Sequence, residues 1–185
     1  YKEMYQDGIC HIQNQLYSKS VCCEDINYKE ASDDEKTVLF ELYCKLVNYF
    51  GPSVGFELSV VCYPADLEEY RKILAIPAQG DQFDVIRKEY SDMLVRQVSK
   101  SRYERRICVT FTIEAENIKQ ARSRLSQIES DVINHFRALS VDTVPMNGYE
   151  RLAVFHKCLH LEEPRKFRFN WDSLNKTGLS SKDYI

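Results

Sequence analysis

Residues 103–139 read YERRICVTFTIEAENIKQARSRLSQIESDVINHFRAL, and they hold the clearest strand and the clearest helix of this 185-residue chain. Residues 103–114 alternate between apolar and other residues, with a period of two that is typical of a β-strand. From Ile118 onward the apolar residues recur every three or four positions, which places them on one face of a helix. These residues are Ile118, Ala121, Leu125, Ile128, Val132, Phe136 and Leu139. The stretch therefore predicts a strand over 103–114 and an amphipathic helix over 118–139.

The N-terminal part repeats the alternation of strand and helix. A weak period of two over residues 8–28 predicts two short strands joined by a turn at Asn14-Gln15. Ser32 and Glu35 have the spacing of a capping box, in which each side chain accepts a hydrogen bond from the other residue's amide. The helix that follows has its apolar residues on one face, at Leu39, Leu42, Leu46 and Phe50, and Gly51-Pro52 ends it.

The central part predicts one further strand and two helices. Residues 56–63 form an apolar strand, and Val61 and Tyr63 on its second face lead us to expect that both faces are covered. Residues 66–74 predict a short helix. Residues 82–98 predict a longer one, with an apolar face of Phe83, Ile86, Tyr90 and Met93 beside Leu94.

After residue 139 we expect a short strand over 141–144. A second capping box at Asn147 and Glu150 then begins a helix that carries Leu152, Phe155 and Leu159. The pattern predicts one α+β domain over residues 1–164, with a mixed or antiparallel sheet covered by several amphipathic helices. A split β-α-β arrangement of the ferredoxin-like kind is a candidate for part of it. Residues 165–185 predict a tail that packs on another element or leads into one.

Composition excludes several classes of protein. The 25 Lys and Arg residues against 28 Asp and Glu give a formal net charge of −3, so overall charge gives no reason to expect a nucleic-acid partner. No stretch approaches the roughly 20 apolar residues of a membrane-spanning helix. The seven cysteines are odd in number and irregular in spacing, which favours a reducing compartment with cysteines used as small apolar residues.

Nucleotide and hydrolase motifs are absent from the sequence. No pair of the six glycines fits G-x-x-x-x-G-K-[ST], and neither G-x-G-x-x-G nor G-x-S-x-G occurs. His156 and His160 are one helical turn apart and could face one metal ion, but Cys158 lies on the other side of that helix and no second ligand cluster exists. We therefore expect no catalytic residue, no cofactor and no metal site in this chain.

A basic cluster is the best candidate for a binding surface. It consists of Arg96, Lys100, Arg102, Tyr103, Arg105 and Arg106, with Glu104 as the opposing charge. Such a cluster suits phosphates, an acidic protein or anionic lipid. The alternative is structural, because cations near a helix C-terminus interact favourably with the helix dipole.

Several runs resemble a known family. The C-terminal runs are GYERLAVFH (148–156), FRFNWDSL (167–174) and GLSSKDYI (178–185), and the N-terminal runs are DGIC (7–10), YSK (17–19) and DINY (25–28), with EY at 89–90. They resemble the N-terminal domain of the VirB/TrbE/CagE-like ATPases that energise conjugative transfer in Gram-positive mobile elements. These are ATPases of type IV secretion, and the resemblance spans nearly the whole chain.

The resemblance implies a role in a longer protein. In that family, ATP and Mg²⁺ are bound by a motor domain on the C-terminal side of this region, and none of the motor's catalytic residues has a counterpart here. The resemblance implies a non-catalytic domain that docks the motor to inner-membrane components of the secretion channel and helps copies of the ATPase assemble. It implies a cytoplasmic location, peripheral at the cell membrane. Because the chain begins with Tyr1, we expect both of its ends to be cuts. The alternative function is a free-standing nucleic-acid adaptor that uses the basic cluster.

Overall fold

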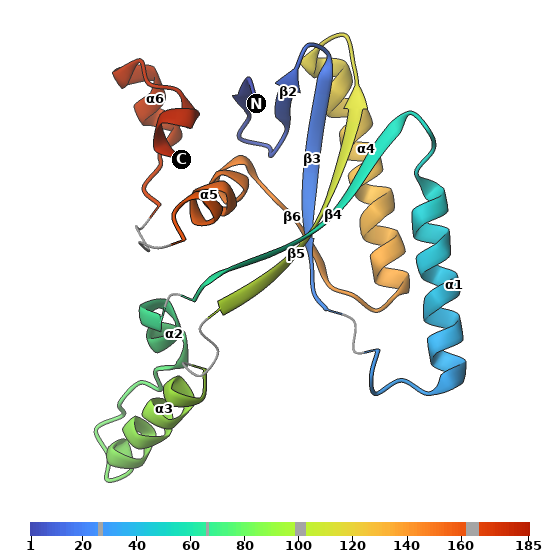
Figure 1. The fold of residues 1–185 in the computed structure, drawn as a ribbon. Helices are drawn as coiled ribbons and strands as arrows, with labels where there is room; N and C mark the ends of the chain where they lie inside the picture. Colours follow the sequence, from blue (N-terminus) through green and yellow to red (C-terminus); the bar gives the residue numbers. More distant parts are fainter. Residues whose placement is uncertain (26–27, 66, 99–102, 162–166) are drawn as a thin grey trace.

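The computed structural model describes residues 1–25, 28–65, 67–98, 103–161 and 167–185 (Figure 1). Its strands are β1 (Glu3–Met4), β2 (Cys10–Gln13), β3 (Leu16–Cys23), β4 (Val54–Pro64), β5 (Tyr103–Glu114) and β6 (Thr143–Pro145). Its helices are α1 (Asp33–Tyr49), α2 (Leu67–Leu74), α3 (Asp84–Val98), α4 (Ile118–Ala138), α5 (Gly148–Leu159) and α6 (Trp171–Thr177), followed by the 3₁₀-helix η1 (Ser181–Tyr184). The fold is α+β, as the sequence predicts.

The sheet is antiparallel. Its strands lie in the order β1-β2-β3-β5-β4, and β6 pairs with the part of β3 that β2 leaves free. The segment β3-α1-β4-β5-α4-β6 follows the split β-α-β arrangement, because its strands lie side by side in the order β4-β5-β3-β6. The ferredoxin-like prediction is confirmed for this part of the chain. Helices α2 and α3 are an insertion between β4 and β5.

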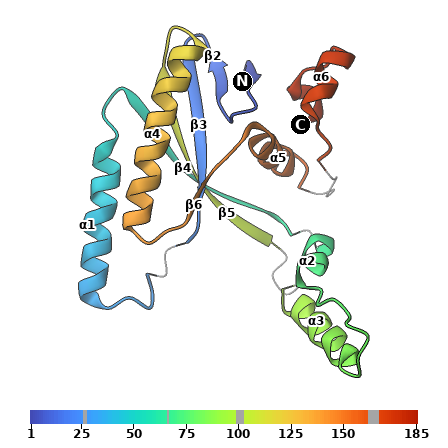
Figure 2. The same ribbon diagram turned by 180° about the vertical axis from the view of Figure 1, so that it is seen from behind.

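Helices α1 and α4 cover one face of the sheet (Figure 2). The main core lies between them and the strands, and Phe111, Val109, Leu125 and Val132 are fully buried there. Truncating such a residue to Ala costs about 2 to 5 kcal/mol, because a close-packed interior leaves a cavity. Both predicted capping boxes form, and each begins its helix at the expected residue.

The other face of the sheet is polar where β3, β5 and β4 lie side by side. It presents Ser18, Ser20, Thr110, Thr112, Glu57 and Ser59. Helix α5 and the two ends of the chain lie over this side, where a second cluster joins Met4, Cys10 and Leu152 to aromatic residues of the C-terminal segment. The described part of the predicted tail, residues 167–185, contains α6 and η1 and packs on the N-terminal strands.

The prediction that both faces of β4 are covered is wrong. Phe50 at the end of α1 packs against Phe56, with ring centroids 4.5 Å apart. Farther along the same face, Leu58 and Val60 are 49% and 57% exposed. Alternation along a strand identifies the residues that share a face, but it carries no information about what covers that face. Strand β1 was also missed, because two residues are too few for a period to show.

Helices α2 and α3 form an arm at the far end of the β4–β5 ribbon (Figure 1). The ribbon's last pair is Pro64 with Tyr103. The apolar face predicted for the second arm helix exists, but it lies at the surface, and its members are 43% to 60% exposed: Phe83, Ile86, Tyr90 and Met93. We call these four residues the arm stripe. Among the described residues, no helix combines the length and the hydropathy needed to cross a membrane.

Candidate functional site

The basic cluster does not form one surface in the described structure. Lys100 and Arg102 lie outside the described residues. Arg96 is exposed in the last turn of α3, and Tyr103 is exposed at the start of β5. Arg105 and Arg106 are consecutive strand residues, so their side chains point to opposite faces of the sheet.

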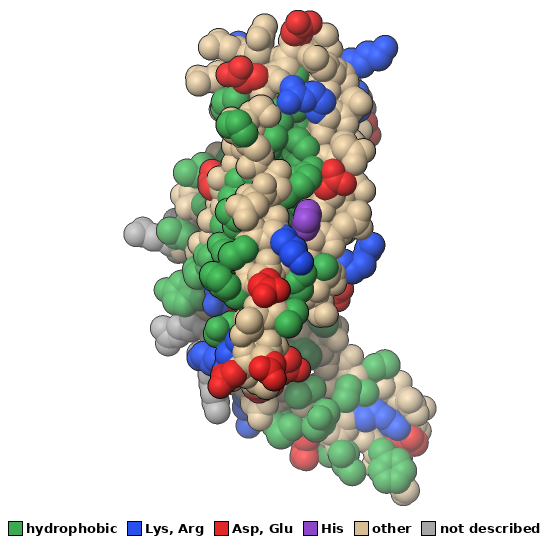
Figure 3. Space-filling model, turned by 90° about the vertical axis from the view of Figure 1, so that its right-hand side faces the viewer, with side chains coloured by type: hydrophobic (Ala, Val, Ile, Leu, Met, Phe, Trp, Pro, Cys, Tyr) green, Lys and Arg blue, Asp and Glu red, His purple; other side chains and the backbone are tan. Residues whose placement is uncertain are grey.

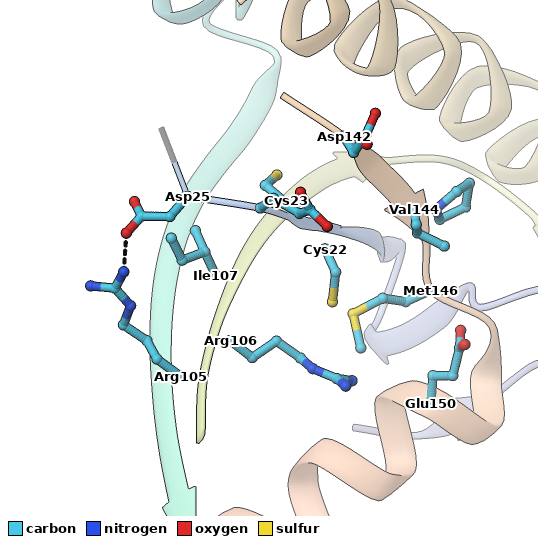
Figure 4. Close-up of a pocket in the computed structure, with 12 residues that line it drawn as sticks. Cys22, Cys23, Asp25, Arg105, Arg106, Ile107, Asp142, Val144, Met146 and Glu150 are labelled. Atoms are coloured by element: carbon cyan, nitrogen blue, oxygen red, sulfur yellow. Dashed lines mark hydrogen bonds and ion pairs between the residues drawn. The ribbon is translucent and has the colours of Figure 1, made fainter. Parts of the chain in front are cut away.

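Arg105 and Arg106 line a pocket of about 630 Å³ between the ends of β3 and β6, the first part of β5 and the start of α5 (Figure 4). Arg105 forms an ion pair with Asp25 at the rim, while Arg106 extends into the pocket. Four carboxylates also line it, from Glu24, Asp25, Asp142 and Glu150. Because carboxylates outnumber guanidinium groups, the pocket does not favour a phosphate.

Two thiols meet beside this pocket. Cys22 on β3 and Cys108 on β5 are directly paired in the sheet, and their Sγ atoms lie 3.5 Å apart. The Sγ of Cys108 is also 3.9 Å from the Sδ of Met146. No sequence pattern indicates this pair, because it depends on the register between two strands that are far apart in the chain.

The two thiols have opposite pKa shifts. The hydrogen bond with Cys108 lowers the pKa of Cys22 to about 7, burial opposes that shift, and the Arg106 guanidinium assists it. The same hydrogen bond, with burial, raises the pKa of Cys108. Since the thiolate is the nucleophilic form, Cys22 is the reactive member of the pair near neutral pH.

Alkylation of Cys22 by iodoacetamide is therefore expected to rise with pH around a midpoint near 7. A lowered pKa means that the thiolate is present above that pH and is lost below it. Quantitative peptide mass spectrometry measures the rate at each cysteine. Buried Cys10, whose pKa is raised chiefly by burial, is the internal control. A Cys22 midpoint above 8.5, or one that Cys108→Ala leaves unchanged, would contradict the assignment.

Arg151 is a buried residue that the sequence analysis did not select as a site residue. Its side chain is 6% exposed, and its guanidinium donates to the carbonyl of Gly8 at 2.8 Å and to the carbonyl and hydroxyl of Ser18 at 3.0 and 3.1 Å. No carboxylate of the described residues bonds to it, and burial lowers the pKa of the guanidinium. One sequence signal was available: Arg151 precedes Val154 by three residues and Cys158 by seven, which places it on their face of α5.

Arg151 lies on a groove of about 790 Å³ above the polar face of the sheet. Hydroxyl groups of β3 and β5 form its floor, while Phe155 and Leu159 of α5 and Val61 of β4 give it apolar walls. The guanidinium joins the N-terminal loop, β3 and α5, so its bonds hold this side of the molecule together.

The histidine pair of α5 lies beside this region. The rings of His156 and His160 are 4.5 Å apart between centroids, and His156 is buried against Phe167. Within the described ranges, no three side chains of the His, Cys, Asp and Glu types converge in a way that would hold a metal ion.

The chain matches no protein-family model, no curated protein and no solved structure. Its function is therefore inferred from its surfaces and from the sequence resemblance.

Proposed function

We propose that this chain is the non-catalytic N-terminal domain of a conjugative-transfer ATPase of the type IV secretion kind. It docks the motor to an inner-membrane component of the translocation channel, at the cytoplasmic face of the membrane, and aids assembly of the oligomer. The observation that supports docking is the arm stripe, an apolar helix face whose four side chains are 43% to 60% exposed.

The composition of the arm stripe suits a protein interface. Phe, Tyr and Met are enriched in such interfaces, while Lys, Glu and Asp are depleted from their centres. Phe83, Ile86 and Tyr90 are each at least half exposed, although burying side chains of this size is worth about 1.5 to 3 kcal/mol each. The partner that fits is a cytoplasmic helix or loop of the channel component with an apolar face of its own.

In this proposal, ATP hydrolysis belongs to a longer protein of which this chain is the N-terminal part. ATP and Mg²⁺ would be bound by a motor domain on the C-terminal side of Ile185. The gene that encodes this chain is therefore expected to continue into G-x-x-x-x-G-K-[ST] within the next few hundred codons. A downstream reading frame without that motif would remove the ATPase assignment.

Docking is tested in the full-length protein with the double substitution Ile86→Asp and Tyr90→Asp. We expect the frequency of element transfer between cells to fall at least tenfold, because truncating even one interface hot spot commonly costs 2 kcal/mol or more. ATP hydrolysis by the purified protein should stay unchanged.

Val85→Asp is the matched control, because Val85 is an exposed apolar residue of the same helix that lies outside the arm stripe. Transfer by this variant should remain within about twofold of wild type. An equal loss of transfer in both variants, or normal transfer in the double variant, would count against docking through the arm stripe.

The nucleic-acid adaptor remains an alternative prediction. It requires salt-dependent binding of DNA that is lost when Arg102, Arg105 and Arg106 are replaced by Ala. The ion pair of Arg105 and the carboxylates around Arg106 argue against it. A chain that leaves a labelled duplex unbound at low salt would exclude this alternative.

A further inference from the structure

Strand β4 is an edge of the sheet. It pairs with β5 along one side, and no described strand pairs with its other side. The strand is 11 residues long, so this side offers a row of backbone N–H and C=O groups over about 36 Å. Among the described residues, the backbone bond found on this strand outside the ladder joins the Val54 amide to the Gly51 carbonyl, at the start of the strand.

The edge lacks most of the features that prevent an exposed strand from pairing with another chain. Such strands are commonly protected by Lys residues, by a β-bulge or by an internal proline. In β4 the register against β5 continues without a shift from Val54 to Pro64, and proline occurs at the last position alone. Glu57 is the strand's one charged residue, and the exposed Leu58 and Val60 stand in its middle.

Helix α1 carries a second apolar surface next to this edge. Phe40, Tyr43 and Val47 are spaced by three and four residues and are 65%, 44% and 39% exposed. They lie beside the core-facing residues Leu39, Leu42 and Leu46, of which Leu46 is fully buried, but do not belong to that face. Figure 3 looks onto α1 and shows hydrophobic side chains gathered along this side of the molecule.

The strand is complementary to itself. A two-fold axis perpendicular to the sheet keeps each face on the same side in both copies. Opposed residues share a face and side chains alternate along a strand, so the sequence numbers of two opposed residues must differ by an even number. Centred on Ser59, antiparallel pairing brings Val54 opposite Pro64 and uses all 11 residues. Leu58 then faces Val60 of the second copy, and Glu57 faces Val61. Centred on Glu57, the pairing would bring two carboxylates together, which is unfavourable.

We propose that the chain forms a two-fold dimer through β4, with the two strands pairing antiparallel about Ser59. The sheets of the two copies join into one, and both α1 helices lie on the same face of it. The end of α1 packs over the Val54 end of β4 in the same copy. Because the antiparallel pairing brings Val54 of the second copy opposite Pro64 of the first, α1 of the second copy lies beside the uncovered half of the first copy's β4. Phe40, Tyr43 and Val47 then contact Leu58 and Val60 across the axis. This inference rests on the proposed function, in which copies of the ATPase assemble, and it assigns β4 as the contact surface between two copies.

A cross-link at the axis tests the proposal. Ser59→Cys is made in a Cys62→Ser, Cys108→Ala background, because Cys108 is the partner of Ser59 on β5 and would compete for the new thiol. It places two thiols directly opposite each other across the axis, where the Cα atoms of paired strands lie about 4.5 to 5.5 Å apart, within disulfide range. With a mild oxidant such as oxidised glutathione, we expect most of the chain to run as a covalent dimer. Glu57→Cys in the same background is the matched control, because its two copies would lie about 13 Å apart, beyond disulfide range. It should give at most a tenth as much dimer.

The second measurement is the mass in solution by light scattering. The wild-type chain is expected at twice its 21.7 kDa, and Leu58→Lys with Val60→Lys at 21.7 kDa. Circular dichroism checks that the double variant is folded. A monomeric wild-type chain at 100 µM (a concentration chosen for the test), a dimer that keeps its mass in the Lys variant, or equal cross-linking at positions 57 and 59 would each overturn the proposal. Because these tests use the 185-residue chain alone, their failure would leave docking through the arm stripe untouched.

Discussion

Gly148→Ala is expected to destabilise the protein by about 2 to 4 kcal/mol and to loosen the packing of the C-terminal segment. A Cβ on Gly148 would lie 2.1 Å from the carbonyl oxygen of Tyr5 and 2.7 Å from Cζ2 of Trp171. Neither distance is possible without movement, and the first neighbour is backbone. The start of α5 must therefore move away from both the N-terminal segment and Trp171.

Trp171 reports this change directly, because it is the chain's one tryptophan. Its emission should shift to longer wavelength in Gly148→Ala as the indole leaves its edge contact with Phe169. Urea unfolding gives the change in free energy. Gly51→Ala is the matched control, since nothing lies within 4 Å of its added Cβ. Identical emission and urea midpoints for the two variants would show that the close approach at Gly148 is not maintained in solution.

Arg151→Met is expected to reduce the free energy of unfolding by about 2 to 4 kcal/mol. The methionine keeps much of the side-chain volume, but the carbonyls of Gly8 and Ser18 lose a charged donor. A buried carbonyl left without a partner costs about 1 to 3 kcal/mol. Removing the buried guanidinium, to which no carboxylate of the described residues bonds, offsets part of that loss, because its desolvation is also relieved.

Arg124→Met is the control for Arg151→Met. Arg124 also donates to a backbone carbonyl, that of Glu114 at 2.8 Å, but its side chain is exposed and water can replace it. We expect a change within about 0.5 kcal/mol for this variant by urea unfolding. Equal stability of Arg151→Met and wild type would show that the desolvation cost of the guanidinium equals the stabilisation by its hydrogen bonds. Arg151 would then make no net contribution to the stability of the fold.

Features encoded by neighbouring residues could be predicted from the sequence. The helix of Ser32 and Glu35 begins where its capping box requires, and β5 and α4 follow their apolar periods. The order of these elements was sufficient to suggest the split β-α-β arrangement. Each of these predictions depends on contacts within one element or on chain order.

Features that depend on contacts between distant segments could not be predicted. The period of β4 identified the face that holds Leu58 and Val60, but whether a helix covers that face depends on where α1 ends above it. For the same reason, the sequence predicted the apolar face of the arm stripe but not that this face is exposed. The Cys22–Cys108 pair and the burial of Arg151 depend on strand register and on the packing of both chain ends. Of the predicted basic cluster, Arg105 and Arg106 share a pocket in which carboxylates outnumber guanidinium groups.

The place where the arm is inserted has an evolutionary consequence. Because Pro64 and Tyr103 are paired neighbours, the arm leaves and re-enters the domain at a single point of the sheet. The strands on either side belong to a hairpin, which a short turn is able to close. The arm can therefore be exchanged between related chains as a cassette without disturbing the order of the sheet. Substitutions in the inserted segment can therefore accumulate without changing the packed core between α1, α4 and the strands.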